Sequence, residues 1–174
     1  MKVERTLISM DGKSTSLLNG YRIEQEDFSD AFYEEVYPLF EKHWEEIASD
    51  KDKIPLSPDY DKYYLLQDHE LLKIVTCRVE STHELVGYTF SILSTHLHYK
   101  ETMVAENDLI FVLPEHRQGW LGYRLIKETE KILKQAGCVV LQMRVKTTND
   151  FGKVVERLGY QHSETLYRKY IGED

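Results

Sequence analysis

The chain has 174 residues, of which 41% are hydrophobic and 30% charged, a composition typical of a folded globular domain. The formal net charge of −8 disfavours nucleic acid and anionic membrane surfaces as partners. No apolar run approaches the roughly 20 residues that span a membrane, and residues 1–16 lack the apolar core of a signal peptide. Cys77 and Cys138 are too few for a disulfide framework, so we expect buried thiols in a reducing cytoplasm. We therefore expect a single cytoplasmic domain over residues 1–174.

The N-terminal part of the chain predicts a small strand element followed by helices. Residues 1–20 carry few large apolar groups and end in a turn-like Asn-Gly pair, which predicts a flexible arm or a hairpin. A short first strand is expected at 21–24. Apolar side chains then recur at helical spacing from Phe28 to Ile47, and Pro38 predicts that this stretch forms two helical pieces. A short helix is expected at 60–69.

The middle of the chain changes to strand-type patterns. Residues 71–80 and 84–94 are rich in β-branched and aromatic side chains, and the tight connection between them predicts an antiparallel hairpin. A second connection over 96–102 leads into a third strand, 103–113. Three meandering strands are therefore expected before the next helix.

A long helix and a crossover are predicted for the C-terminal part. Apolar residues fall on one helical face from Leu121 to Ala136, and Gly137 is expected to cap this helix. A strand at 139–146, a short helix at 150–158 and a last strand at 165–171 follow. This order predicts an α+β fold, with a mixed, mostly antiparallel sheet flanked by helices and a β-α-β crossover.

The loop between the third strand and the long helix has the features of an anion site. A small-residue loop that opens a helix leaves several N–H groups unpaired at the positive end of the helix dipole. Arg117 adds a positive charge beside it. We therefore expect a phosphorylated ligand to bind the residues of this loop, which are Arg117, Gln118, Gly119, Trp120, Leu121, Gly122 and Tyr123.

The segment VLPEHRQGWLGYRLI resembles the signature loop, Arg/Gln-x-x-Gly-x-Gly/Ala, of the GNAT superfamily of acetyl-coenzyme A-dependent N-acetyltransferases. The resemblance covers roughly residues 71–171, and VVERLGY is similar to the family's closing helix. Trp120 departs from the pattern, because it stands where the first signature glycine falls. Val155 also departs, since many members carry a tyrosine there as the acid that protonates the leaving thiolate. The motifs HLHYK, AENDLIFVLPEHR and ERLGY more narrowly resemble phage-encoded members.

The resemblance implies a coenzyme A-binding site that surrounds the anion loop. The family's pattern places the acetyl carbonyl and the pantetheine arm on backbone N–H groups of the third strand, which correspond to Phe111 and Val112. Asn149, near the start of the closing helix, is implied as a further coenzyme contact. Acetyl-coenzyme A is thus the expected co-substrate, without a metal, and homodimers are frequent among members.

Acetyl transfer to an amine needs a group that accepts the amine's proton. Glu106 and Asp108 are candidates, because they alternate to the same face of the third strand. The alternative is that both are solvated carboxylates at a strand edge. His98 is a rival base, since imidazole titrates near neutral pH. His96 and His98 lack an obvious third ligand for a metal ion.

The acid that protonates the leaving thiolate is left open among three tyrosines. Tyr160 replaces an aromatic residue that is usually part of the core. Tyr167 and Tyr170 lie on the predicted last strand, and Tyr167 is the preferred candidate because that strand is expected beside the crossover.

The leading hypothesis is therefore transfer of an acetyl group to an amine of a small molecule, a peptide or a protein lysine. The acidic residues on the helical face between 34 and 46 are typical of a solvated surface, and the alternative is that they help to recruit a cationic acceptor. The alternative is a catalytically inactive module of the same fold, which binds an acyl-coenzyme A or another protein.

Overall fold

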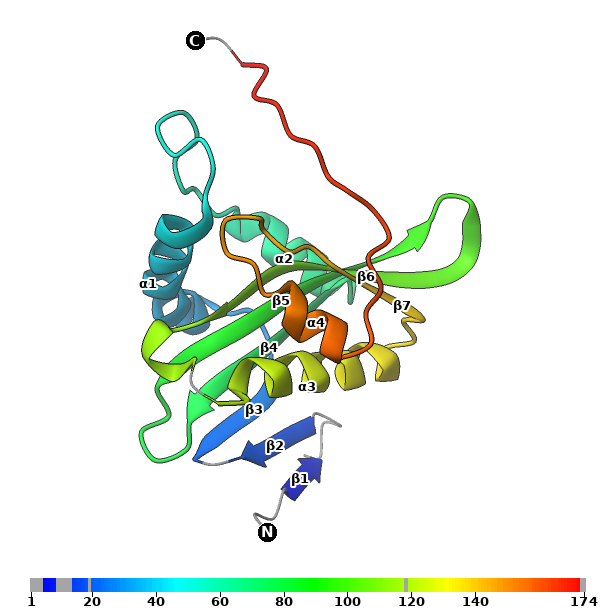
Figure 1. Cartoon of the computed structure of the whole chain (residues 1–174). Coiled ribbons are helices and arrows are strands. Elements are labelled where there is room, and N and C mark those ends of the chain that lie inside the picture. Colours follow the sequence, from blue (N-terminus) through cyan, green and yellow to red (C-terminus); the bar gives the residue numbers. More distant parts are fainter. Residues whose placement is uncertain (1–4, 9–13, 19, 118, 173–174) are drawn as a thin grey trace.

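The computed structural model describes residues 5–8, 14–18, 20–117 and 119–172. Within these residues, seven strands form one sheet in chain order, and only the β6–β7 pair is parallel. Helices α1 and α2 cover one face of this sheet, and α3 and α4 lie on the other (Figure 1). The predicted mixed, mostly antiparallel sheet flanked by helices is confirmed. The strands are β1 (Arg5–Ile8), β2 (Ser14–Leu18), β3 (Tyr21–Glu26), β4 (Leu72–Val79), β5 (Leu85–His96), β6 (Tyr99–Val112) and β7 (Val140–Met143).

Helix α1 (Asp30–Ile47) is one continuous helix, so the prediction of two helical pieces was wrong. It begins at Ser29, whose side-chain oxygen accepts a hydrogen bond from the backbone N–H of Phe32 at 3.1 Å. An interior proline costs about 3 kcal/mol. Burial of one large apolar side chain contributes about 2 kcal/mol, and α1 buries several against the sheet, namely Phe32, Tyr33, Val36, Leu39 and Phe40. Packing therefore outweighs the defect at Pro38.

The β4–β5 hairpin is confirmed, and the next hairpin differs from the prediction. Helix α2 (Tyr60–Asp68) precedes β4. The Asp59 carboxylate caps this helix by accepting a hydrogen bond from the backbone N–H of Lys62 at 3.0 Å. The predicted connection over 96–102 was wrong, because β5 and β6 continue until His96 pairs with Tyr99. This end of the hairpin projects beyond the helices, so its side chains are solvated and carry no apolar alternation (Figure 1).

Helix α3 (Leu121–Gln135) forms the predicted crossover between β6 and β7. Gly137 ends it with a left-handed φ of +88°, and the N–H of Gly137 and that of Cys138 donate to Lys134 O and Leu133 O at 3.1 and 3.0 Å. The predicted glycine cap is therefore confirmed. Strand β7 is shorter than predicted.

The C-terminal tail, which we define as residues 161–172, corrects the prediction of a last strand at 165–171. Helix α4 (Gly152–Arg157) ends two residues before Gly159. The tail that follows pairs with no strand of the described residues. It runs away from the sheet as an extended segment (Figure 1). The composition of this tail suits a strand, but pairing also needs a neighbouring edge within reach.

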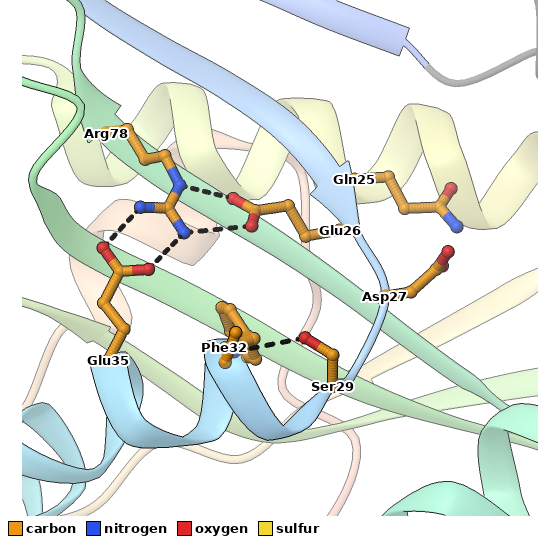
Figure 2. Close-up of a pocket in the computed structure, with 8 residues that line it drawn as sticks. Gln25, Glu26, Asp27, Ser29, Phe32, Glu35 and Arg78 are labelled. Atoms are coloured by element: carbon orange, nitrogen blue, oxygen red, sulfur yellow. Dashed lines mark hydrogen bonds and ion pairs between the residues drawn. The ribbon is translucent and has the colours of Figure 1, made fainter.

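A buried arginine joins α1 to two strands. Arg78 on β4 is 8% exposed, and its guanidinium donates to the carboxylates of Glu26 on β3 and Glu35 on α1, with N–O distances of 2.6 to 3.0 Å. Figure 2 shows this arrangement beside an open pocket lined by β3, β4 and the first turns of α1. Arg78 also donates to His83 O at 2.9 Å. These bonds orient α1 on the sheet, and α1 in turn contributes residues to the site described below.

Replacing Arg78 by leucine should lower the free energy of unfolding by about 2 kcal/mol, because the carboxylates of Glu26 and Glu35, which are 23% and 41% exposed, lose their charge-assisted hydrogen bonds to the guanidinium. Urea unfolding monitored by circular dichroism measures the change. Lys51→Ala is the control, since it removes an exposed ion pair with Glu45 and should cost less than about 1 kcal/mol. Equal effects of the two substitutions would contradict a structural role for the Arg78 bonds.

Candidate functional site

The defining feature of the site is a separation of two parallel strands. Strands β6 and β7 are paired where residues 104–107 face residues 140–143. Beyond this point β7 ends, while β6 continues to Val112. Within the described residues, the edge of β6 from 108 to 112 is therefore without a strand partner on the side of β7. Ligands of open α/β sheets bind where neighbouring strands separate in this way.

Two backbone N–H groups point out from this open edge. Leu113 N–H donates to Val86 O of β5 at 2.8 Å. In an antiparallel pair the direction of the N–H groups alternates, so Phe111 also points toward β5, while Ile110 and Val112 point outward. Of the two amides implied by the resemblance, Val112 thus has the outward direction and Phe111 does not. Ile110 was missed, because strand register cannot be deduced from composition.

A β-bulge lies at the place where the strands separate. Ser91 pairs with Asn107 and Phe90 pairs with Leu109, which leaves Asp108 as the extra residue on β6. The Asn107 side chain is buried and donates to Leu109 O at 3.1 Å, which holds the bulged backbone in place. The bulge re-aims the strand, so the simple alternation that placed Glu106 and Asp108 on one face does not hold through it.

The carboxylates of Glu106 and Asp108 remain close enough to interact. Glu106 is paired with Arg144. Asp108 is an exposed residue, yet partial desolvation, followed by the nearby Glu106 charge, raises the pKa of its carboxyl group. Burial, and then the charges of Asp108 and Asp59, raise the pKa of Tyr63 to about 12. Tyr63 of α2 therefore stays protonated beside the bulge, a contribution that the sequence did not reveal.

The other predicted catalytic residues lie away from the bulge. His98 is in the turn between β5 and β6, ten residues from Asp108 along an extended strand, which corresponds to roughly 30 Å. Tyr167 is on the C-terminal tail and is 89% exposed. Tyr170 of the same tail lies under the ammonium group of Lys53. The structure thus brings together Glu106 and Asp108, and it separates His98 and Tyr167 from them.

The N-terminus of α3 has the properties of an anion site. No side chain of the described residues caps its first turn, where Trp120 is the N-cap residue. Gly119 has a left-handed φ of +78° and turns the chain into the helix. A Cβ atom placed on Gly122 would meet no atom within 4 Å, so the space beside this residue of the first turn is open. The helix therefore presents N–H groups and its positive dipole end to this space.

The remaining loop residues divide into anchors and exposed groups. Leu121 is 4% exposed and anchors the start of α3 in the core. Trp120 is 62% exposed and contacts Tyr123 edge-on, with ring centroids 5.3 Å apart. Gln118 lies outside the described residues.

A carboxylate of α1 occupies two of the groups expected to contact the coenzyme. Arg117 donates through Nε to Val112 O at 2.7 Å and through both terminal nitrogens to Glu46. Asn149 donates its side-chain N–H to the same Glu46. Hydrogen bonding from Arg117, partly offset by desolvation, lowers the pKa of Glu46. We call these three residues the Glu46 clasp. From the sequence, Glu46 was part of an acidic helix face that was either solvated or able to recruit a cationic acceptor.

A buried histidine packs between the clasp and β6. The ring of His43 stacks on Phe111 at 4.8 Å and 22°, and its Nδ1 is 3.0 Å from the hydroxyl oxygen of Tyr88. Burial lowers the pKa of His43 to about 4, with Glu46 opposing and Arg117 adding to this shift. His43 is therefore neutral at pH 7, and it packs against Phe111, which lies on β6 between the two residues with outward amides.

The described residues contain no cluster of three or more His, Cys, Asp or Glu side chains that could hold a metal ion. None of the helices in the described part combines the length and apolar character needed to cross a bilayer.

One comparison with known proteins identifies the family, and solved structures show the same fold. Residues 21–160 match the acetyltransferase (GNAT) family. No curated protein matches the sequence significantly. Among solved structures, an aminoglycoside acetyltransferase from an uncultured soil metagenomic sample has a TM-score of 0.68 and 16% identity, over 90% of this chain and 98% of its own.

Two further structures have the same fold. The ribosomal-protein-alanine N-acetyltransferase of Brucella melitensis biovar Abortus 2308 has a TM-score of 0.65 and 17% identity, over 87% of this chain and 99% of its own. The glucosamine-6-phosphate N-acetyltransferase of Arabidopsis thaliana has a TM-score of 0.63 and 10% identity, over 86% and 99%. At such low identities these likenesses show the fold and not the acceptor.

The buried neutral His43 should make the protein less stable in mild acid. The unfolded chain takes up a proton near the ordinary histidine pKa of 6.5, whereas the folded chain does so only near pH 4. Stability is therefore lost as pH falls through this window, by about 2 kcal/mol at pH 5 relative to pH 7. Urea unfolding at both pH values should show that His43→Phe removes about this much of the difference. His98→Ala, at the exposed hairpin turn, should leave the difference unchanged, and a His43→Phe protein with the wild-type pH dependence would contradict the assignment.

Proposed function

Because the chain belongs to the acetyltransferase (GNAT) family, we propose that this N-acetyltransferase uses acetyl-coenzyme A to acetylate an amine of its acceptor. The observation that carries the proposal is the open edge of β6. Its outward amides and the uncapped N-terminus of α3 lie at the same end of the crossover. One region thus offers donors for amide and carbonyl groups, and the other offers donors for phosphate.

The coenzyme side is assigned from the directions of the backbone donors. The N–H groups of Ile110 and Val112 are available to the pantetheine amides and the acetyl carbonyl. The first turn of α3, over residues 121–123, is available to the pyrophosphate, because its N–H groups are uncapped and its dipole is positive there. Acetyl-coenzyme A supplies the acetyl group as a reactive thioester.

Arg117 and Asn149 are proposed to contact the coenzyme only when Glu46 releases them. Both are hydrogen-bonded to Glu46, so a phosphate that binds the same N–H groups must compete with the carboxylate. The ion pair is only partly buried, with side-chain exposures of 38% for Arg117 and 26% for Glu46. Such pairs contribute about 1 kcal/mol or less, so exchange is energetically accessible.

We propose that Asp108 is the general base, which takes the proton from the amine that becomes acetylated. Its carboxyl group has a raised pKa and lies at the bulge, where β6 begins to open. A raised pKa brings a carboxylate closer to the proton affinity that a general base needs at neutral pH. Glu106 is a weaker candidate, because it is already ion-paired with Arg144. Tyr63, which stays protonated, is proposed as the group that donates a proton to the leaving thiolate.

The acceptor proposed is a cationic amine. Glu106 and Asp108 at the open edge favour a positively charged molecule, and the chain carries a net charge of −8. The similar structures named above include enzymes for an aminoglycoside and for a protein alanine. We therefore propose a polyamine, an aminoglycoside or a basic peptide as the class to test first.

A second candidate function is a coenzyme-binding module without turnover. Val155 is 7% exposed and packs in the core. It stands at the position where many members carry the tyrosine that protonates the leaving thiolate. Trp120 is also a departure from the signature loop. Mass spectrometry of an amine panel incubated with acetyl-coenzyme A separates the two candidates, since only the enzyme adds an acetyl group.

Coenzyme binding should be sensitive to Gly122 without any loss of fold. Gly122→Leu places a side chain in the open space before α3, so we expect the calorimetric Kd for acetyl-coenzyme A to rise at least about tenfold. The melting temperature of the ligand-free protein should not fall, because leucine is a better helix former than glycine. Lys134→Leu, at the other end of α3, is the control. A wild-type protein that binds no coenzyme, or a variant with unchanged Kd, would exclude the proposed phosphate site.

Asp108→Asn should lower kcat by about 100-fold or more, because the amide cannot accept a proton. In the wild type, kcat/KM should fall as pH drops through the raised pKa of Asp108, since the protonated carboxyl cannot act as a base. The variant should lose this dependence while it keeps its affinity for the coenzyme. Glu106→Gln is the matched comparison on the same strand, and a larger loss there would transfer the role of base to Glu106.

A further inference from the structure

Trp120 places a large aromatic side chain in solvent at the start of α3. The indole is 62% exposed, although Trp120 is the N-cap residue, a position where short polar side chains are preferred. Its side chain makes no capping hydrogen bond, and its backbone C=O serves the helix by accepting from the N–H of Arg124 at 2.9 Å. The helix therefore uses the backbone at this position and has no need of the indole.

The exposed indole is nevertheless held in one orientation. Tyr123 lies three residues further along, and the two rings meet edge-to-face, with centroids 5.3 Å apart and an angle of 88° between the ring planes. A contact of this kind leaves at least one aromatic face of the indole open. A side chain that is already ordered loses little conformational entropy when a ligand packs on it.

Trp120 and Tyr123 supply the large exposed side chains next to the proposed phosphate donors. Within residues 119–123, the two glycines carry no side chain, and Leu121 is 4% exposed and lies in the core. The N–H groups proposed to bind the pyrophosphate belong to residues 121–123, directly after Trp120. A pyrophosphate held there has the pantetheine on one side, toward β6, and the adenosine on the other. The adenosine thus leaves the phosphates beside an open aromatic face.

We propose that the adenine base of the coenzyme stacks on the open face of Trp120, an inference that rests on the proposed binding of acetyl-coenzyme A. Adenine is flat, uncharged and aromatic, so it packs on an indole face without a polar partner. Stacking of a base on an aromatic side chain strengthens binding by about tenfold or more. Trp120 stands where the signature loop of the family has its first glycine, so this departure gives the chain a side-chain contact for the base.

Calorimetric titration of the full chain with coenzyme A tests the stacking. Trp120→Ala should raise the Kd by about tenfold, because the base loses its stacking surface. Trp120→Phe keeps an aromatic face and should stay within about threefold of the wild type. Trp120→Leu keeps apolar area without an aromatic face, so it should behave like Trp120→Ala. The melting temperatures of the ligand-free proteins should agree, since the side chain is mostly exposed and caps nothing.

A shorter probe tests which end of the coenzyme is recognised. Phosphopantetheine carries the pantetheine arm and one phosphate but lacks the adenosine, so the wild type and Trp120→Ala should bind it with the same Kd. Gly122→Leu is the matched comparison in the same turn. It occludes the proposed phosphate donors, which both probes need, and should weaken the binding of both.

Tryptophan fluorescence supplies a readout that does not depend on affinity. The chain has two tryptophans, and the other is Trp44 on α1. In the Trp44→Phe protein all tryptophan emission comes from Trp120, and saturating coenzyme A should quench it, because a stacked base quenches an indole. Saturating phosphopantetheine should leave this emission unchanged. The Trp120→Phe protein, which retains Trp44, should show quenching with neither probe.

The outcomes separate this inference from the proposed function. A wild-type protein that binds neither coenzyme A nor phosphopantetheine overturns both. If the wild type binds coenzyme A and Trp120→Ala binds it equally well, the stacking alone is overturned. An equal loss of affinity for the two probes in Trp120→Ala, or wild-type affinity for coenzyme A in Trp120→Leu, also overturns the stacking, since neither result depends on an aromatic face against the base.

Discussion

The early end of β7 is the constraint on which the candidate site depends. Had β7 continued alongside β6, the amides of Ile110 and Val112 would be used inside the sheet. The bulge at Asp108 lies at the same position, so the loss of a strand partner and the change in strand direction coincide. Helix α3 then returns the chain to the sheet with its uncapped N-terminus at the open end. Backbone geometry, more than any single side chain, thus creates the binding capacity.

Charges on α1 connect this opening to the rest of the sheet. At one end of the helix, Glu35 is fixed by the buried Arg78, and near the other end Glu46 holds Arg117 and Asn149. His43 lies between these ends and stacks on the strand below. Acidic residues that look like a plain solvated face in sequence therefore have two separate structural duties.

Local patterns predicted local structure well, and pairing between distant segments less well. The crossover, the glycine cap at Gly137 and the β4–β5 hairpin follow from periodicity and turn chemistry, which are written in neighbouring residues. Pro38 misled because the helix propensity of one residue is weak against tertiary packing. The outward direction of Ile110 depends on register, and the position of Tyr167 depends on whether an edge is within reach. Neither property is encoded in a short window of sequence.

The Glu46 clasp has a consequence for how the loop region stays ordered. Its carboxylate presents two oxygens to Arg117 and one of them to Asn149, much as a phosphate group presents oxygens to a guanidinium. The protein therefore carries its own stand-in anion, which keeps the loops on both sides of the opening in register with α1. A polyanion that binds the N–H groups of Arg117 now held by Glu46 has to displace this internal anion, so its entry there is an exchange of counter-ions, with loops that are already assembled.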